Sequence, residues 1–148
     1  MRWIVLSFVV FMMAFPLHAG SPNASIVDTK QPFESYISKL KSAISMNKMG
    51  LVSQACATCG AKKIGVTIPG NRVLMIFNPH FAVRMLKASL PAGVEAPLRI
   101  YVTENDAGNA RVSYKKPSDV FAPYNVKALD EMAKELDMIF KKIVQDSL

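Results

Sequence analysis

Cysteine and histidine are scarce in this chain of 148 residues, which has 2 of each. A disulfide-dense scaffold needs many more cysteines, so an apolar core has to hold the fold. Glycine and proline number only 7 and 9, which excludes collagen-like and low-complexity structure. The chain is 51% hydrophobic and long enough to bury a sizeable core. We therefore expect one globular domain whose stability requires no cofactor.

Several chemical signatures are also missing. A closed zinc site needs four ligands, but the chain after residue 19 offers only Cys56, Cys59 and His80. Haem attachment needs a histidine directly after the second cysteine, where Gly60 stands. Neither a phosphate-binding loop nor a G-x-S-x-G elbow occurs. We predict no metal, no cofactor and no nucleotide or hydrolase site, and expect a binding module rather than an enzyme.

Residues 1–19 have the pattern of a secretory signal peptide. Arg2 supplies the positive start, the apolar stretch Ile4–Phe15 follows, and Ala19 is a small residue at the expected cleavage site. The apolar stretch is shorter than the roughly 20 residues of a membrane span, although an uncleaved anchor stays open as an alternative. We expect residues 20–148 to form the mature domain, without a membrane span, in the periplasm or outside the cell.

The net charge of the chain is +7, and the basic residues are dispersed along it. Nucleic-acid binding proteins concentrate such charge on one face or helix. An exported protein also has no DNA partner, so we expect the charge to aid solubility. No nucleic acid is predicted as a partner.

Apolar periodicity predicts the elements of the domain. Strands are expected at Ser25–Lys30, Leu51–Ala55, Arg72–Phe77, Leu98–Glu104 and Ala110–Lys115; helices at Phe33–Met49, Pro79–Ser89 and from Val126 onward; and one or two helical turns at Thr58–Ile64. The main order is β-α-β-β-α-β-β-α, without the alternation of a doubly wound parallel sheet. We predict an α+β fold with a single, largely antiparallel sheet packed by the N- and C-terminal helices.

Several short motifs occur in order along the chain: Gly60-Ala61-Lys62-Lys63-Ile64-Gly65, Phe77-Asn78-Pro79, Ala96-Pro97-Leu98-Arg99 and Val112-Ser113-Tyr114-Lys115-Lys116-Pro117. Over about residues 30–145 the chain resembles DUF302, a family of small bacterial domains of unknown function. The resemblance implies a TBP-like α+β fold and often a homodimer, with no established reaction. Many members have a histidine just before the Gly-Ala pair, where this chain has Ala57-Thr58-Cys59.

The sequence Cys56-Ala57-Thr58-Cys59 is the one motif with obvious chemistry. Two thiols at this spacing can form a disulfide in an oxidising compartment, and a helix start stabilises the first thiolate. A thioredoxin-like site opens a long helix, whereas only one or two turns are expected here. A structural disulfide, redox activity, metal binding and free buried thiols all stay open.

Aromatic residues gather around the predicted sheet and its ends. They and one histidine form a candidate ligand pocket: His80, Phe77, Tyr101, Tyr114 and Phe140. Packing in the core is the alternative interpretation of the aromatics. We predict a non-enzymatic module that binds a small apolar or amphipathic ligand, or a protein partner, between the sheet and the last helix. The alternative function is a periplasmic thiol redox protein that uses Cys56 and Cys59.

A homodimer is the predicted assembly. The hairpin from Leu98 to Lys115 has only one apolar set of alternate residues, and its other face presents the uncharged Tyr101, Thr103 and Ser113. An edge or a face of this hairpin could then pair with a second copy of the chain.

Overall fold

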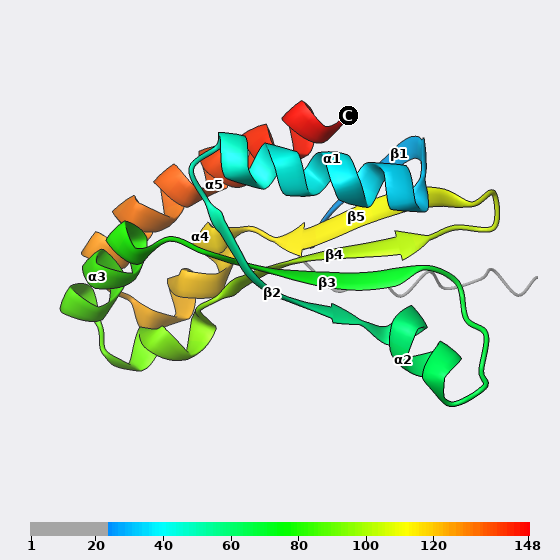
Figure 1. The fold of residues 1–148 in the computed structure, drawn as a ribbon. Coiled ribbons are helices and arrows are strands. Elements are labelled where there is room, and N and C mark those ends of the chain that lie inside the picture. Colours follow the sequence, from blue (N-terminus) through cyan, green and yellow to red (C-terminus); the bar gives the residue numbers. More distant parts are fainter. Residues whose placement is uncertain (1–23) are drawn as a thin grey trace, which may run out of the picture.

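The computed structural model describes residues 24–148, whose fold is drawn in Figure 1. The elements are β1 (Ala24–Pro32), α1 (Phe33–Met46), β2 (Gly50–Cys56), α2 (Ala57–Lys63), β3 (Asn71–Phe77), α3 (Pro79–Ala88), η1 (Pro91–Glu95), β4 (Leu98–Glu104), β5 (Asn109–Lys115), α4 (Pro117–Phe121), η2 (Ala122–Tyr124) and α5 (Lys127–Ser147). The predicted signal peptide lies outside the described residues.

All five strands form one antiparallel sheet in the order β1-β5-β4-β3-β2. The turn of the β4–β5 hairpin is closed by a 2.9 Å hydrogen bond from the Asn105 N–H to the Asn109 carbonyl. Gly108 in this turn has φ +75°, a conformation that favours glycine. The hairpin lies in the middle of the sheet, so neither of its strands has a free edge. Edge pairing through this hairpin, as the sequence allowed, is therefore excluded; the free edges belong to β1 and β2.

One face of the sheet, here called the inner face, is covered by the first and last long helices. Figure 1 shows α1 and α5 on the same side of the sheet. Alternate residues of the central strands point to these helices and are buried: Leu74, Ile76, Ile100, Val102, Ala110 and Val112. Phe33, Tyr36, Ile37, Leu40, Ala43 and Ile44 meet them from α1, and Leu129, Met132, Ala133, Leu136, Phe140, Ile143 and Val144 from α5. The predicted α+β fold with its two packing helices is thus confirmed.

Polar contacts also join the N-terminal end of α1 and the end of β1 to the C-terminal end of α5. The buried hydroxyls of Ser147 and Tyr36 are hydrogen-bonded at 2.9 Å, and burial raises the pKa of Tyr36. The Gln31 side-chain amide donates to the Leu148 carbonyl at 2.6 Å, which ties the last residue to β1. These bonds hold the C-terminal end of the chain on the sheet.

The opposite face of the sheet, here called the outer face, carries the other set of alternate residues. Tyr101 is 38% exposed and Ile26 is 50% exposed. Arg99 and Lys115 are also exposed here. None of the helices within residues 24–148 has the length and apolarity of a membrane span. The outer face is where side chains of the central strands are accessible.

One connection differs from the elements that the sequence predicts, whereas the short helix predicted at Thr58–Ile64 is present as α2. The segment after Pro117, where periodicity predicts no element, forms α4, because Pro117 suits a helix start and the Phe121 side chain is buried. The Ser118 N–H donates to the Asp137 carboxylate of α5 at 2.9 Å. In contrast, α2 has no buried residue and stands apart from the α1–α5 layer in Figure 1.

Candidate functional site

The five residues of the predicted pocket do not share one cavity. Tyr101 and Tyr114 line the same cleft. Phe140 is fully buried behind it and packs its ring against Tyr114, with centroids 5.5 Å apart. Phe77 lines a separate small cavity, and His80 is exposed at the second residue of α3, outside the lining of both. The structure therefore brings together two of the five residues in an accessible site and places a third directly behind them.

The cleft has a volume of about 580 Å³. Its floor consists of residues from β4 and β5, and its wall comes from η1, α4 and η2. The lining residues are Ala24, Glu95, Leu98, Arg99, Tyr101, Ser113, Tyr114, Lys115, Asp119, Val120 and Pro123. This volume lies within the roughly 300–1,000 Å³ typical of small-molecule sites. The cleft is not in the expected place between the sheet and α5, because buried side chains such as Phe140 and Ile143 fill that interface.

The charges of the cleft are unevenly arranged. Arg99 and Lys115 lie on the strand floor, and neither forms a salt bridge within residues 24–148. On the wall, Glu95 accepts a 3.0 Å hydrogen bond from the Tyr124 hydroxyl, whereas Asp119 lies in the first turn of α4. The cleft therefore presents two cations on its floor and carboxylates on the opposite wall.

Two tyrosine hydroxyls near the cleft are stabilised in the protonated form. Burial raises the pKa of Tyr114. Desolvation, followed by the hydrogen bond to Glu95, raises the pKa of Tyr124. Both groups are therefore neutral at physiological pH and can donate hydrogen bonds.

The second cavity lies between α3, α5 and one end of the sheet. It is apolar and lined by Met49, Ile76, Phe77, Asn78, Phe81, Ala82, Met85, Ala96, Leu98, Phe121, Met132 and Leu136. Its volume of about 30 Å³ is close to that of one water molecule. A space of this size is a packing defect rather than a site for an organic ligand.

Cys56 and Cys59 form a disulfide at the junction of β2 and α2. This finding excludes free thiols in this state, one of the four alternatives for the pair. Cys56 is half-buried, whereas Cys59 is exposed. The Cys59 N–H donates to Cys56 Sγ at 3.0 Å. The Cys56 sulfur is thus held by the backbone, and the other cysteine is the more exposed residue of the pair.

The residues between and after the cysteines fix the position of this bond. The Thr58 hydroxyl donates to the Pro69 carbonyl at 3.1 Å and accepts from the Asn71 N–H at 2.8 Å. Lys62 and Lys63 are exposed in the last turn of α2. Thr58 therefore ties the disulfide loop to the start of β3.

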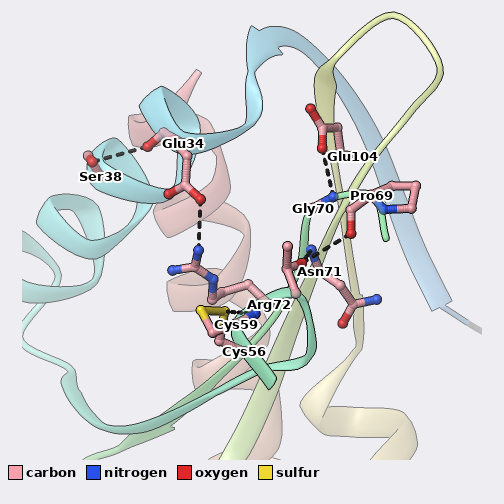
Figure 2. Close-up of polar contacts among 10 residues, drawn as sticks. Glu34, Ser38, Cys56, Cys59, Pro69, Gly70, Asn71, Arg72 and Glu104 are labelled. Carbon is pink, nitrogen blue, oxygen red and sulfur yellow. Dashed lines mark hydrogen bonds and ion pairs between the residues drawn. A yellow bond between two sulfur atoms is a disulfide. The ribbon is translucent and has the colours of Figure 1, made fainter. Parts of the chain in front are cut away.

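Arg72 is the charged residue that the fold places beside the disulfide. It is paired with Cys56 across the β2–β3 ladder, and Figure 2 shows its side chain next to the two sulfur atoms. Arg72 Nη2 donates to Glu34 of α1 at 2.8 Å, and the guanidinium lies 5.8 Å from the centre of the Phe33 ring. The disulfide thus lies against a cation fixed by two residues of α1.

Metal-ligand geometry is not found in the described part of the chain. Within residues 24–148, no group of three or more His, Cys, Asp or Glu side chains is positioned to hold a metal ion. His80 also lies beyond the opposite end of β3 from Arg72 and hence far from the cysteines. His80 therefore cannot complete a site with Cys56 and Cys59 in this conformation.

Several residues of the cleft and of the disulfide's surroundings are not predicted from the sequence. Alternation places Arg99 and Lys115 on the polar side of two strands but predicts no site there. Asp119 and Val120 lie in a connection for which no element is predicted. Pro117 at a helix start and Asp119 in its first turn were the available signals for α4. For Arg72 no local signal exists, because its role depends on which residue it opposes across the sheet.

Comparisons with known proteins agree with this architecture. The family model for the domain of unknown function DUF302 matches residues 26–146. The crystal structure of an uncharacterized conserved DUF302 protein from Bacillus stearothermophilus superposes with a TM-score of 0.77 at 20% sequence identity, over 86% of this chain and 100% of that chain. No curated protein matches the chain. At this identity the crystal structure shows a shared fold, and the family match extends over nearly the whole described domain, so the chain belongs to the DUF302 family.

Proposed function

We propose that this DUF302 protein is an exported, non-enzymatic binding module whose cleft takes a small amphipathic anion. The observation that carries the proposal is the cleft of about 580 Å³ beside Tyr101 and Tyr114. Its central strands are held between neighbours on both sides, so the floor is preformed. A preformed concave site loses little conformational entropy when it binds a ligand.

The lining indicates the chemistry of the ligand. Leu98, Val120 and Pro123 offer apolar contacts, and the tyrosines add aromatic surface. Arg99 and Lys115 attract an anionic group to the floor, while Asp119 disfavours one at the wall. An apolar body with one carboxylate, the amphipathic alternative, therefore fits better than a purely apolar ligand.

Decanoate is a suitable probe, because it joins an apolar chain to one carboxylate. We expect the purified protein to bind it saturably below its micelle concentration in calorimetric titrations, and to bind decyltrimethylammonium more weakly. The double substitution Arg99→Ala with Lys115→Ala should weaken decanoate binding about fivefold, since each exposed ion pair is worth about 0.2–1 kcal/mol.

The matched control removes two lysines that do not line the cleft, through Lys87→Ala with Lys134→Ala on α3 and α5. These residues are exposed, and the net charge changes by the same amount. The control should bind decanoate like the unmodified protein. An absence of saturable binding, or equal losses in both double variants, would overturn the proposal.

A second copy of the chain is the proposed protein partner, and edge strand β2 is the surface that favours it. The sequence of β2, Gly50–Cys56, has no charged residue, and Val52 is 55% exposed. The other edge, β1, carries Asp28, Lys30 and Pro32, which are typical guards against edge pairing. Pairing of β2 with β2 of a second copy would give a two-fold dimer.

Sedimentation tests this partner. We expect the dimer mass at high micromolar concentration and a shift toward the monomer in Gln54→Lys, which adds a charge to the β2 edge. Ser42→Lys, on the exposed side of α1, is the control and should leave the mass unchanged. A single-chain mass for the unmodified protein would contradict the dimer.

A second candidate function is thiol–disulfide exchange at Cys56–Cys59. It is favoured by the exposure of Cys59 next to a sulfur held by a backbone N–H. An exchanging pair should equilibrate with glutathione, whereas a purely structural disulfide has a potential below about −300 mV. Equilibration of the unmodified protein in glutathione buffers is the measurement, and resistance to reduction beyond that potential would exclude this function.

A further inference from the structure

We propose that Arg72 stabilises the thiolate of Cys56 when the disulfide opens, and that Cys59 is the sulfur attacked by an incoming thiolate. This inference rests on the second function proposed above, thiol–disulfide exchange, and assigns a role to each residue around the bond. It is carried by three observations: an unpaired donor beside the disulfide, a rigid frame around it, and the unequal exposure of the two cysteine residues.

The first observation is the buried Arg72 Nε–H. The Arg72 side chain is only 11% exposed, and Nε has no hydrogen-bond partner among residues 24–148. Such an unpaired buried donor is unusual and calls for an explanation, for which a redox role is one option. A disulfide sulfur accepts hydrogen bonds only weakly, whereas a thiolate is an anion that a guanidinium binds strongly. Reduction would therefore give this donor an acceptor.

The second observation is that the disulfide cannot easily move away from Arg72. Cys56 and Arg72 are opposite one another in the β2–β3 ladder. The Thr58 hydroxyl, between the cysteines, bonds to both Pro69 and Asn71 just before Arg72. Figure 2 shows Arg72 beside the two cysteines, with Glu34 bonded to its guanidinium. The cation is thus preorganised beside Cys56 before any bond breaks.

The third observation is the asymmetry of the pair. The residue Cys56 is half-buried, and its Sγ already accepts the Cys59 N–H at 3.0 Å. Cys59 is exposed. A Cβ atom placed on the next residue, Gly60, would have no neighbouring atom within 4 Å, so the space beside Cys59 is open. An attacking thiolate therefore reaches Cys59 more readily, and the better-stabilised Cys56 is the natural leaving group.

The exchange step can be written completely. An external thiolate attacks Cys59 Sγ; a new sulfur–sulfur bond forms, the Cys56–Cys59 bond breaks, and its electron pair leaves on Cys56 as a thiolate. A second thiolate of the same reductant then attacks the external sulfur of the mixed disulfide and releases Cys59 as a thiolate. The protein gains two electrons, the reductant becomes a disulfide, and the protein thiolates take up protons according to their pKa values. The required reductant is a thiol such as glutathione.

The charges around Cys56 predict the direction of each effect. Arg72 from β3 lowers the pKa of the Cys56 thiol, and Glu34 from α1 opposes it because its carboxylate neutralises part of the guanidinium charge. Lys62 and Lys63 of α2 are exposed and contribute less, because solvent screens them. Removing Glu34 should therefore act in the opposite direction to removing Arg72.

The test measures the pKa of the Cys56 thiol in Cys59→Ser protein by the ultraviolet absorbance of the thiolate. We expect a value below the ordinary pKa of about 8.5, an increase of about one unit or more with Arg72→Met, and a decrease with Glu34→Gln. Arg72→Lys should recover part of the effect, since it retains the charge without the planar Nε–H donor. Arg84→Met on α3, an arginine that likewise pairs with a glutamate and lies over a phenylalanine ring, is the matched control and should leave the pKa unchanged.

The outcomes separate the two proposals. If glutathione does not reduce the unmodified protein, the exchange function itself fails. If glutathione reduces it but Arg72→Met and Glu34→Gln leave the Cys56 pKa unchanged, only the role of Arg72 is overturned. Glu34→Gln lies on an exposed helix surface, so it provides an answer even if Arg72→Met does not fold. Trapping of the mixed disulfide on Cys56 rather than on Cys59 would overturn the assigned direction of attack.

Discussion

The region under α1 and α5 and the arm formed by β2 and α2 (residues 50–63) keep their structure by different means. The first buries whole rows of apolar side chains, including Phe140 and Leu40. In the arm, α2 buries no residue and is held by the disulfide, by the Thr58 hydrogen bonds and by pairing of β2 with β3. The first region is therefore stabilised by many apolar contacts at once. Order in α2 depends on a few bonds, one of which is a disulfide that reduction can open.

The two proposed sites follow this division. The floor of the cleft belongs to central strands of the collectively packed region, so its shape should persist under most conditions. The disulfide belongs to the arm, where opening one bond can alter local order without unfolding the domain. Asn71 lies between them: its N–H donates to Thr58, and its side-chain amide donates to the Tyr101 hydroxyl of the cleft.

The largest effect is expected from Phe140→Ala. This ring is fully buried and packs on Tyr114, so its removal should lower the free energy of unfolding by about 3–5 kcal/mol. Urea denaturation measures the change. Met138→Ala, on the same helix but 67% exposed, should change the free energy by less than about 0.5 kcal/mol. A small loss for Phe140→Ala would show that the region is not collectively packed.

A smaller loss is expected from Gly70→Ala, where the two regions meet. A Cβ at Gly70 would lie 2.6 Å from Phe33 Cδ1, a ring that is itself buried. The displaced ring should cost about 1–3 kcal/mol of stability in urea denaturation. Gly60→Ala in α2 meets nothing within 4 Å and is the control, expected to retain or slightly gain stability. Equal effects at the two glycines would contradict the described packing.

Opening the disulfide should act locally. In the double variant Cys56→Ser with Cys59→Ser, the loss of global stability should stay below about 2 kcal/mol, because the closed loop is very short. Native-state hydrogen exchange should become at least about tenfold faster in α2 and remain unchanged in α5. Unchanged exchange in α2 would mean that the disulfide does not maintain the order of the arm.

The smallest expected effect is on the stability of the fold at acidic pH. The hydrogen bonds from Arg84 lower the pKa of Glu135, and those from Asn47 and Lys142 lower the pKa of Asp146. Because these pKa values are lower in the folded than in the unfolded protein, the carboxylates stabilise the fold above pH of about 4.3, and this contribution is lost as the pH falls through the folded-state pKa. Glu135→Gln should flatten the acid branch of the stability curve slightly. An unchanged acid branch would show that the Arg84 pair contributes nothing measurable.

Much of this fold was predictable from apolar periodicity. The helical spacing of Tyr36, Ile37 and Leu40 and the alternation of Ile100 and Val102 follow directly from burial on one side. The strand order was not predictable, because periodicity does not say which strands are neighbours. Pairing through an edge of the β4–β5 hairpin, one of the two ways in which the sequence allows a homodimer, is therefore not available in this sheet.

The position of Arg72 depends on a detail that no local pattern encodes. The β2–β3 register shifts between Leu51 and Ser53, and after this irregularity Cys56 opposes Arg72. Without the shift Cys56 would oppose Asn71, and a one-residue change of register reverses which face each side chain occupies. The cleft was missed for a related reason: α4, which forms its wall, is only 5 residues long and owes its place to the burial of Phe121.

Amide chemical-shift mapping tests the central claim, that the cleft binds an amphipathic anion, most directly. Decanoate would be titrated into isotopically labelled protein with the disulfide intact. We expect saturable shifts of the amides of Arg99, Tyr101, Lys115 and Val120 and unchanged positions for the α2 amides. Shifts confined to the β2–α2 arm, or no saturable shifts at all, would contradict this claim.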